Sequence, residues 1–214
     1  MDDFAKKQAE AYDRMAFGYA IQKFAHNPAI PDLKIFRTYL SEKPLILDIG
    51  CGVGSDAQYL ASSGCQVLGI DLSDAMIAEA QRRVGGVEFQ KADFRETNFP
   101  AATFDGVWCS TVFHHVQLKD QRDFVAKCQS ILKPSGTMYI STKRSGTNDD
   151  SEGWVKEHFG AEPGEQGGIE VERFVKKLSD QAFKKLLEEV GFEIIRFKIW
   201  GNKTWMDIFA RKRS

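Results

Sequence analysis

Residues 45–54 read Leu-Ile-Leu-Asp-Ile-Gly-Cys-Gly-Val-Gly, and this stretch decides the fold. A short apolar run contains an acid at its end, and three glycines follow at alternate positions. A buried parallel strand that ends in glycines lets the backbone approach a ligand beside the positive end of the next helix. The stretch therefore predicts a ligand-binding loop after the first strand of an α/β sheet.

A second apolar run, residues 65–71, ends in the carboxylate of Asp71. Asp71 lies 21 positions after Gly50, about the offset at which a strand-end acid accepts hydrogen bonds from ribose hydroxyls. Together the two segments predict a site for a nucleoside-like cofactor.

The glycine spacing helps to separate two classes of cofactor. A dinucleotide fingerprint, G-x-G-x-x-G, needs its third glycine where Ser55 stands, and Gly54 comes one residue too early. Asp48 also places negative charge close to where a pyrophosphate would lie, whereas a cationic ligand tolerates it. Because S-adenosylmethionine carries an ammonium and a sulfonium, the pattern favours a methyl donor over NAD.

Four segments resemble, in order, the motifs of class I S-adenosylmethionine-dependent methyltransferases, of the small-molecule, type-11-like kind. They are LDIGCGVGSDAQYL (47–60), GIDLSDAMIAEAQRR (69–83), KADFRETNFPAATFDGVWCSTVFHHV (91–116) and ILKPSGTMYIST (131–142). The resemblance covers residues 44–142 well and residues 179–211 moderately. It implies S-adenosyl-L-methionine as cofactor, S-adenosyl-L-homocysteine as product, and methyl transfer to O, N or S of a small-molecule acceptor.

Alternating strand and helix patterns predict an α/β fold. Strands are expected at 45–49, 66–70, 87–90, 104–109 and 136–142, with helices at 55–63, 74–84 and 119–132. Such alternation requires a parallel sheet with right-handed crossovers. A later helix, ended by Gly191, precedes strands at 192–200 and 204–210, and the tight turn at Gly201-Asn202 makes that pair antiparallel.

We therefore expect a Rossmann-like three-layer sandwich with a doubly wound, seven-stranded, mostly parallel sheet and an antiparallel C-terminal hairpin. The resemblance implies the strand order 3-2-1-4-5-7-6. Residues 1–214 are expected to form a single methyltransferase domain. Its parts are N-terminal lid helices (1–42), a cofactor-binding core (44–142), a cap or lid insertion (143–175), and a C-terminal helix and hairpin (179–211).

Cofactor contacts are expected at the strand ends. Asp71 is expected to bind the ribose diol by charge-assisted hydrogen bonds, and Asp48 the methionine ammonium. The resemblance implies that Asp93 accepts the exocyclic amine of adenine and that the amide of Phe94 meets a ring nitrogen. A purely structural carboxylate is the alternative for the first two. The other expected contacts are Tyr19, Gly50, Cys51, Gly52, Gly54, Leu72, Met76, Cys109 and Ser110.

His114 and His115 follow the fourth strand and are the catalytic candidates, because an imidazole beside the methyl group takes a proton from a hydroxyl, amine or thiol. A histidine packed against the sheet is the alternative. Adjacent side chains diverge, so the two do not share a metal, and no metal site is expected. Substrate contacts are expected at Tyr12, Tyr19, Arg144, Trp154 and Arg173, where a guanidinium suits an acidic substrate group and plain surface charge is the alternative.

Composition argues against several other classes. The 29 Lys and Arg residues nearly balance 30 Asp and Glu residues, so no overall positive field indicates nucleic acid. No apolar run predicts a membrane span, and the N-terminus is unlike a secretory signal. The 4 scattered cysteines predict reduced thiols in a cytoplasmic protein. We expect a monomer or homodimer that acts on a small molecule, with no nucleic-acid or membrane partner.

Two other functions stay open at this point. An NAD-type Rossmann oxidoreductase is disfavoured by Ser55, by Asp48 and by the C-terminal hairpin. A non-catalytic module that binds S-adenosylmethionine and acts through partners is not excluded, because no motif fixes the catalytic residue.

Overall fold

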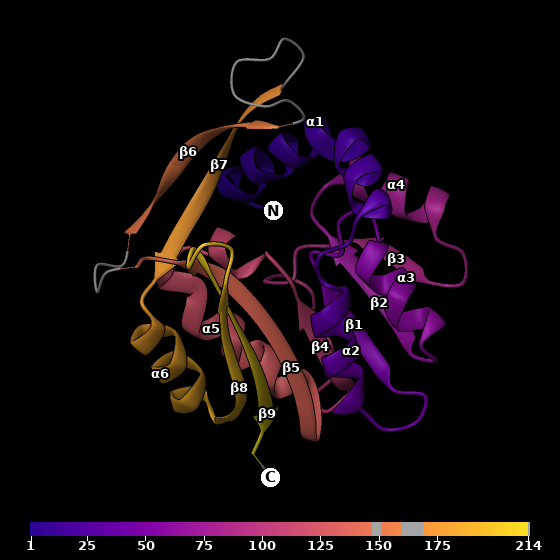
Figure 1. Ribbon diagram of the computed structural model, residues 1–214, viewed down its shortest axis with the longest axis vertical. Coiled ribbons are helices and arrows are strands. Elements are labelled where there is room, and N and C mark those ends of the chain that lie inside the picture. The colour runs from indigo at the N-terminus through magenta and orange to yellow at the C-terminus, as the bar shows by residue number, and fades with distance from the viewer. Residues whose placement is uncertain (147–150, 160–168, 214) are drawn as a thin grey trace.

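The computed structural model describes residues 1–146, 151–159 and 169–213 (Figure 1). The helices in this part of the chain are α1 (Asp3–Ala25), α2 (Ile30–Thr38), α3 (Ser55–Ser62), α4 (Asp74–Arg83), α5 (Leu118–Ile131), α6 (Asp180–Val190) and the 3-10 turn η1 (Phe113–His115). The strands are β1 (Leu45–Ile49), β2 (Gln66–Asp71), β3 (Glu88–Lys91), β4 (Phe104–Cys109), β5 (Leu132–Arg144), β6 (Ser151–Phe159), β7 (Ile169–Leu178), β8 (Phe192–Trp200) and β9 (Trp205–Lys212).

One twisted sheet forms the centre of the molecule. Strands β3, β2, β1, β4 and β5 lie side by side in that order and are parallel. Strand β9 is antiparallel to both β5 and β8. The core order is therefore β3-β2-β1-β4-β5-β9-β8. This is the expected order 3-2-1-4-5-7-6 once β6 and β7 are set aside, and the antiparallel C-terminal hairpin is confirmed.

Alternate side chains of the strands face two separate hydrophobic layers, as the period of two in a strand requires. In β4, Val107 belongs to the layer under α5 and α6, whereas Trp108 belongs to the layer under α2, α3 and α4. Trp108 stacks on Tyr139 of β5 with ring centroids 3.9 Å apart, and its indole N–H donates to Asp56 of α3 at 2.8 Å. The expected three-layer sandwich is thus confirmed.

The insertion after β5 differs from the expectation of seven strands. It contains the antiparallel pair β6 and β7, and β7 also runs parallel to the last two residues of β5, which gives nine strands in the described residues. Sequence patterning missed this hairpin because most of β6 is half-buried or exposed, so its side chains show no apolar alternation. The structure places Ile169 to Leu178 in a strand that runs past residue 175, the expected end of the insertion.

Helix α1 crosses the carboxyl ends of the parallel strands, between α4 and the β6–β7 hairpin (Figure 1). Small residues allow its close approach: Ala16 and Ala20 pack with Met76 of α4, and Met15 packs with Val171 of β7. Asp13 fixes the helix further, since its carboxylate accepts from the Ser73 hydroxyl at 2.5 Å and from the Ala75 N–H at 3.0 Å. This helix therefore roofs the end of the sheet where ligands bind in open α/β folds.

Candidate active site

A cavity lies between α1 and the carboxyl ends of β1, β2, β3 and β4. It encloses about 980 Å³ when the space at its open mouth is included. Its floor comes from residues 49, 50 and 52 and from residues 70–72, its sides come from residues 92–95 and 110–112, and its roof comes from residues of α1 between Phe4 and Tyr19. The expected residues that line it are Tyr12, Tyr19, Gly50, Gly52, Asp71, Leu72, Met76, Asp93, Phe94, Ser110 and His115.

The three loop glycines serve different purposes. All three have a positive φ, which glycine adopts without strain. A Cβ on Gly50 would lie 2.2 Å from Val112, and one on Gly54 would lie 2.8 Å from Phe89, so both are required by packing. A Cβ on Gly52 would meet nothing closer than 3.8 Å, and Gly52 lines the cavity. Of the three, Gly52 is the residue whose missing side chain leaves room for a ligand.

Asp71 stands at the end of β2 with its carboxylate held by the backbone. Its two oxygens accept from the N–H groups of Gly52 and Ser73, each at 2.9 Å. Burial raises the pKa of this carboxyl, and these backbone hydrogen bonds oppose that rise. Each oxygen keeps a lone pair for another donor, which is the arrangement that a ribose diol needs.

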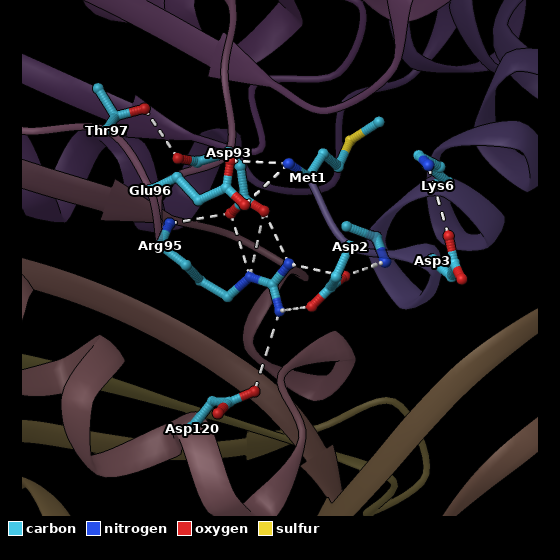
Figure 2. Close-up of polar contacts among 10 residues, drawn as sticks. Met1, Asp2, Asp3, Lys6, Asp93, Arg95, Glu96, Thr97 and Asp120 are labelled. Carbon is cyan, nitrogen blue, oxygen red and sulfur yellow. Dashed lines mark hydrogen bonds and ion pairs between the residues drawn. The ribbon is translucent and has the colours of Figure 1, made fainter.

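The carboxylate of Asp93 lines the cavity and is already bound by Arg95. Asp93 accepts from the Arg95 guanidinium at 2.7 Å and from the Arg95 backbone N–H at 2.9 Å (Figure 2). Phe94 and Leu72 line the cavity close by and offer apolar surface of the kind that an aromatic base requires. The carboxylate expected to accept the adenine amine therefore lines the cavity, and Arg95 sets its orientation.

A chain of hydrogen bonds joins β7 and η1 to the roof helix α1. The carbonyl of Phe174 can only accept, so the Nδ1 of His115, 2.5 Å away, carries the ring proton. The Nε2 then accepts from the hydroxyl of Tyr12 at 2.6 Å, and Tyr12 accepts in turn from Arg173 at 2.8 Å. Arg173 also pairs with Glu157 of β6. Three elements, α1, η1 and β7, thus meet at one tyrosine hydroxyl.

Burial and charge keep this chain in one protonation state. Burial, helped by nearby Arg173, lowers the pKa of His115 to about 3. Burial also raises the pKa of Tyr12 to about 12, with Arg173 opposing the rise. At neutral pH, therefore, His115 is a neutral acceptor and Tyr12 a neutral donor.

Eight predicted residues lie outside the lining of the cavity, for identifiable reasons. Gly54 and Cys51 pack against the core, and Cys109 is fully buried in it. His114 packs its ring against Trp205 instead of facing the cavity. Asp48 is buried beneath the loop, where burial and neighbouring Asp56 raise its pKa.

The three remaining residues of this group come from the expected insertion, residues 143–175. Arg144 donates two hydrogen bonds to Asp180 of α6, at 2.5 and 3.1 Å, and so supports the fold rather than a substrate. Trp154 packs against Phe4 on the outer side, with Lys7 3.9 Å above its ring. Arg173 does not line the cavity itself, but reaches it through Tyr12.

Several lining residues were not predicted, among them Gln8 and Thr111. Gln8 lies one helical turn before Tyr12, and its amide oxygen accepts from the Phe174 N–H at 3.0 Å. Its amide nitrogen has no partner among the residues that the structure describes. Thr111 adopts a φ of 55°, a strained conformation for a β-branched residue, and its N–H donates to Ser141 at 2.6 Å. The helical spacing of Gln8 and Tyr12 is the signal that was available in the sequence; Thr111 had none.

A family model described as a methyltransferase domain matches residues 46–136. The phosphoethanolamine N-methyltransferase of Plasmodium falciparum is 29% identical over 126 residues, which are 55% of this chain and 47% of that protein. The malonyl-[acyl-carrier protein] O-methyltransferase of Enterobacter lignolyticus is 35% identical over 98 residues, 45% of this chain and 38% of that protein. The chain thus spans about half or less of the length of these curated relatives.

Solved structures share the fold. A methyltransferase from Burkholderia thailandensis that acts on 1,6-didemethyltoxoflavin, determined with that compound and S-adenosylhomocysteine, has a TM-score of 0.75 and 19% identity, covering 99% of this chain and 90% of that one. An S-adenosylmethionine-dependent methyltransferase from Methanosarcina mazei has a TM-score of 0.71 and 23% identity, covering 84% and 97%.

The fold and the cavity define an α/β protein with a nucleoside-type site at the ends of its parallel strands. Residues 46–136 match a methyltransferase domain, and the fold is that of class I S-adenosylmethionine-dependent methyltransferases. This match favours S-adenosylmethionine over NAD as the cofactor. None of the helices in the described residues is long and apolar enough to cross a membrane.

Proposed function

We propose that this chain is an enzyme that transfers the methyl group of S-adenosylmethionine to an oxygen, nitrogen or sulfur atom of a small molecule. The single observation that carries the proposal is one cavity that joins Asp71 and Gly52 to the hydroxyl of Tyr12. The first two form a nucleoside site, and the third lies where an acceptor would meet it.

The residues at the nucleoside end fit the cofactor. Asp71 would accept the ribose hydroxyls, and the apolar side chains of Leu72 and Met76 would support the adenine. Tyr19 and Ser110 also line the cavity and would contact the methionine group. Asp48 has a buried carboxylate oxygen without a partner among the described residues, and a cationic ligand above the loop, bound directly or through water, would offset that charge.

Tyr12 is the residue we assign to the acceptor. Its hydroxyl donates to His115 and accepts from Arg173, which leaves one lone pair for an X–H group of the substrate. S-adenosylmethionine supplies an activated methyl group whose leaving group is a neutral thioether. The task left to the protein is to align the acceptor and to exclude water, and a fixed tyrosine hydroxyl serves the first.

The role of His115 changes from the one expected from the sequence. Its Nε2 is taken up by Tyr12 and its pKa lies near 3, so it is poorly suited to remove a proton at neutral pH. We assign it to holding the Tyr12 hydroxyl in place. His114 packs against Trp205 and receives no catalytic role.

The substrate is proposed to be a small molecule. The relatives include an N-methyltransferase and an O-methyltransferase by name, which supports such an acceptor without choosing its atom. A cytoplasmic location is part of the proposal and is supported by 4 free cysteines, all buried. Cell fractionation would test the location.

The experiment that tests the function is a turnover assay. Purified protein is incubated with methyl-labelled S-adenosylmethionine and separate pools of amines, hydroxylated compounds and thiols, and S-adenosylhomocysteine is measured. At least one pool should raise product above the acceptor-free rate in the native chain and not in Gly52→Val. Binding of S-adenosylhomocysteine without turnover in any pool would instead favour the non-catalytic binding module.

A further inference from the structure

Arg95 follows β3 and contacts carboxylates from three separate parts of the chain (Figure 2). Its guanidinium lies 2.7 Å from Asp93, 3.3 Å from Asp2, which precedes α1, and 3.9 Å from Asp120 of α5. Arg95, Asp93 and Asp120 all line the cavity. One cation therefore joins the nucleoside end of the site to the helix that roofs it.

Arg95 sets the direction of the Asp93 carboxylate. One oxygen accepts from the Arg95 backbone N–H at 2.9 Å and from its Nε at 3.1 Å, and the other accepts from its terminal nitrogen at 2.7 Å. The Asp93 side chain is only 6% exposed. Because so many of its lone pairs are already engaged, Asp93 offers a ligand a narrow choice of direction.

Asp2 links Arg95 to the start of α1. One Asp2 oxygen accepts from the Ala5 N–H at 2.8 Å and so caps the helix, and both oxygens accept from Arg95. The next residues along the helix, Phe4 and Ala5, line the cavity. The first turn of α1 is thus fastened across the cavity at the end where Asp93 lies.

We propose that Arg95 is a positioning residue of the cofactor site, which aims Asp93 at the adenine amine and, through Asp2, fastens the first turn of α1 over the adenine. The inference rests on the proposed function, since it takes the adenine of S-adenosylmethionine to lie beside Asp93. Release of the cofactor past this turn then requires the Arg95–Asp2 ion pair to open. Weakening that pair should increase the dissociation rate.

The chain offers a closely matched pair of variants. Asp2→Asn removes the charge but keeps the helix cap, because asparagine caps as well as aspartate. Asp3→Asn removes the same charge one residue later, from a fully exposed side chain 3.4 Å from Lys6 (Figure 2). The readout is the dissociation rate of S-adenosylhomocysteine, measured by stopped flow with each purified full-length variant.

We expect Asp2→Asn to release S-adenosylhomocysteine about threefold faster than the native chain, the size expected for a partly exposed ion pair. Asp3→Asn should release it at the native rate. Arg95→Gln should release S-adenosylhomocysteine at least about tenfold faster than the native chain, because Asp93 also loses its arginine partner. Arg95→Lys should have a dissociation rate between those of Arg95→Gln and the native chain. Adding Asp2→Asn to Arg95→Gln should give no further increase, since the two residues act through one contact.

High salt should reduce the difference between the native chain and Asp2→Asn, because the ion pair is partly exposed to solvent. Equal release rates for Asp2→Asn and Asp3→Asn, with the native chain still binding S-adenosylhomocysteine, would overturn this inference alone. A native chain that binds no S-adenosylhomocysteine would overturn the proposed function and the inference together.

Discussion

Tyr12 and His115 are 103 positions apart in the chain, and the Tyr12 hydroxyl lies 2.6 Å from the His115 Nε2. Tyr12 lies on the roof helix α1 and His115 lies in the turn after β4, so this contact joins the roof of the cavity to the ends of the strands. The backbone of Phe174 in β7 strengthens the junction, because its carbonyl accepts from His115 and its N–H donates to Gln8.

Tyr12→Phe should reduce the rate of methyl transfer while sparing the cofactor. We expect kcat/KM to fall by about 10- to 100-fold, because the acceptor loses the group that orients it. Affinity for S-adenosylhomocysteine, measured by calorimetry, should change by less than about twofold, roughly 0.4 kcal/mol. Tyr39→Phe, outside the cavity, is the control, and full turnover in Tyr12→Phe would refute the role.

The two arginines predicted to bind substrate should behave differently. Arg173→Gln removes a donor to Tyr12 and the partner of Glu157, and should lower turnover by about tenfold, or about 1.4 kcal/mol. Arg144→Gln breaks only the contacts with Asp180 and Lys203, so turnover should stay near the native value while thermal stability falls slightly. Equal loss of turnover in both variants would contradict this division.

The loop glycines allow binding and folding to be separated. Gly52→Val should abolish cofactor binding, since a side chain there enters the cavity, and should leave the chain folded but less stable, because valine is strained at the positive φ of this position. Gly54→Ala should mainly lower stability, by about 1–3 kcal/mol, because its Cβ would lie 2.8 Å from Phe89. Thermal melts and S-adenosylhomocysteine titrations of both variants measure these two effects. Loss of binding in Gly54→Ala, with binding kept in Gly52→Val, would contradict the roles given to the two glycines.

The core of the fold was predictable because its strands and helices are marked by patterns within short stretches of the sequence. The strand of residues 45–49 and the strand of residues 104–109 are confirmed to the residue. The β6–β7 hairpin was not predicted, because its stability comes from packing against α1 through contacts such as that of Met15 with Val171. Such contacts are not periodic in the sequence.

The candidate site likewise has residues that were predictable from the sequence and residues that were not. Gly50, Gly52 and Asp71 belong to one local motif, and the structure brings them together in the cavity. The partnership of Asp2 with Arg95, and that of Gln8 with Phe174, joins residues 93 and 166 positions apart. No spacing rule predicts contacts of that kind, so the residues that set the shape of the roof emerged only from the structure.

The neutral state of His115 predicts that the stability of the fold depends on pH. Its pKa is lowered to about 3 in the folded chain, whereas an unfolded histidine has a pKa of about 6.5. Below that pH only the unfolded chain takes up the proton, so the stability that neutral His115 contributes is full above about pH 6.5 and is lost as the pH falls toward 3. His115→Asn should therefore destabilise the fold by roughly 1–2 kcal/mol less at pH 5 than at pH 7.

Urea denaturation of the native chain and of His115→Asn at the two pH values measures this difference. The same loss of stability at pH 5 and pH 7 would mean that folding does not lower the pKa of His115. The neutral state assigned to His115 at pH 5 would then be wrong.

The central claim is that this cavity binds S-adenosylmethionine and its product, and calorimetric titration with S-adenosylhomocysteine tests it most directly. We expect one site per chain with a micromolar Kd, about 8 kcal/mol of binding free energy, and no binding of NAD at the same concentrations. Asp71→Ala should weaken binding by about 1.5–3 kcal/mol through loss of charge-assisted hydrogen bonds, with Asp74→Ala as the neighbouring control. A native chain that binds NAD instead, or an Asp71→Ala variant with unchanged affinity for S-adenosylhomocysteine, would contradict the claim.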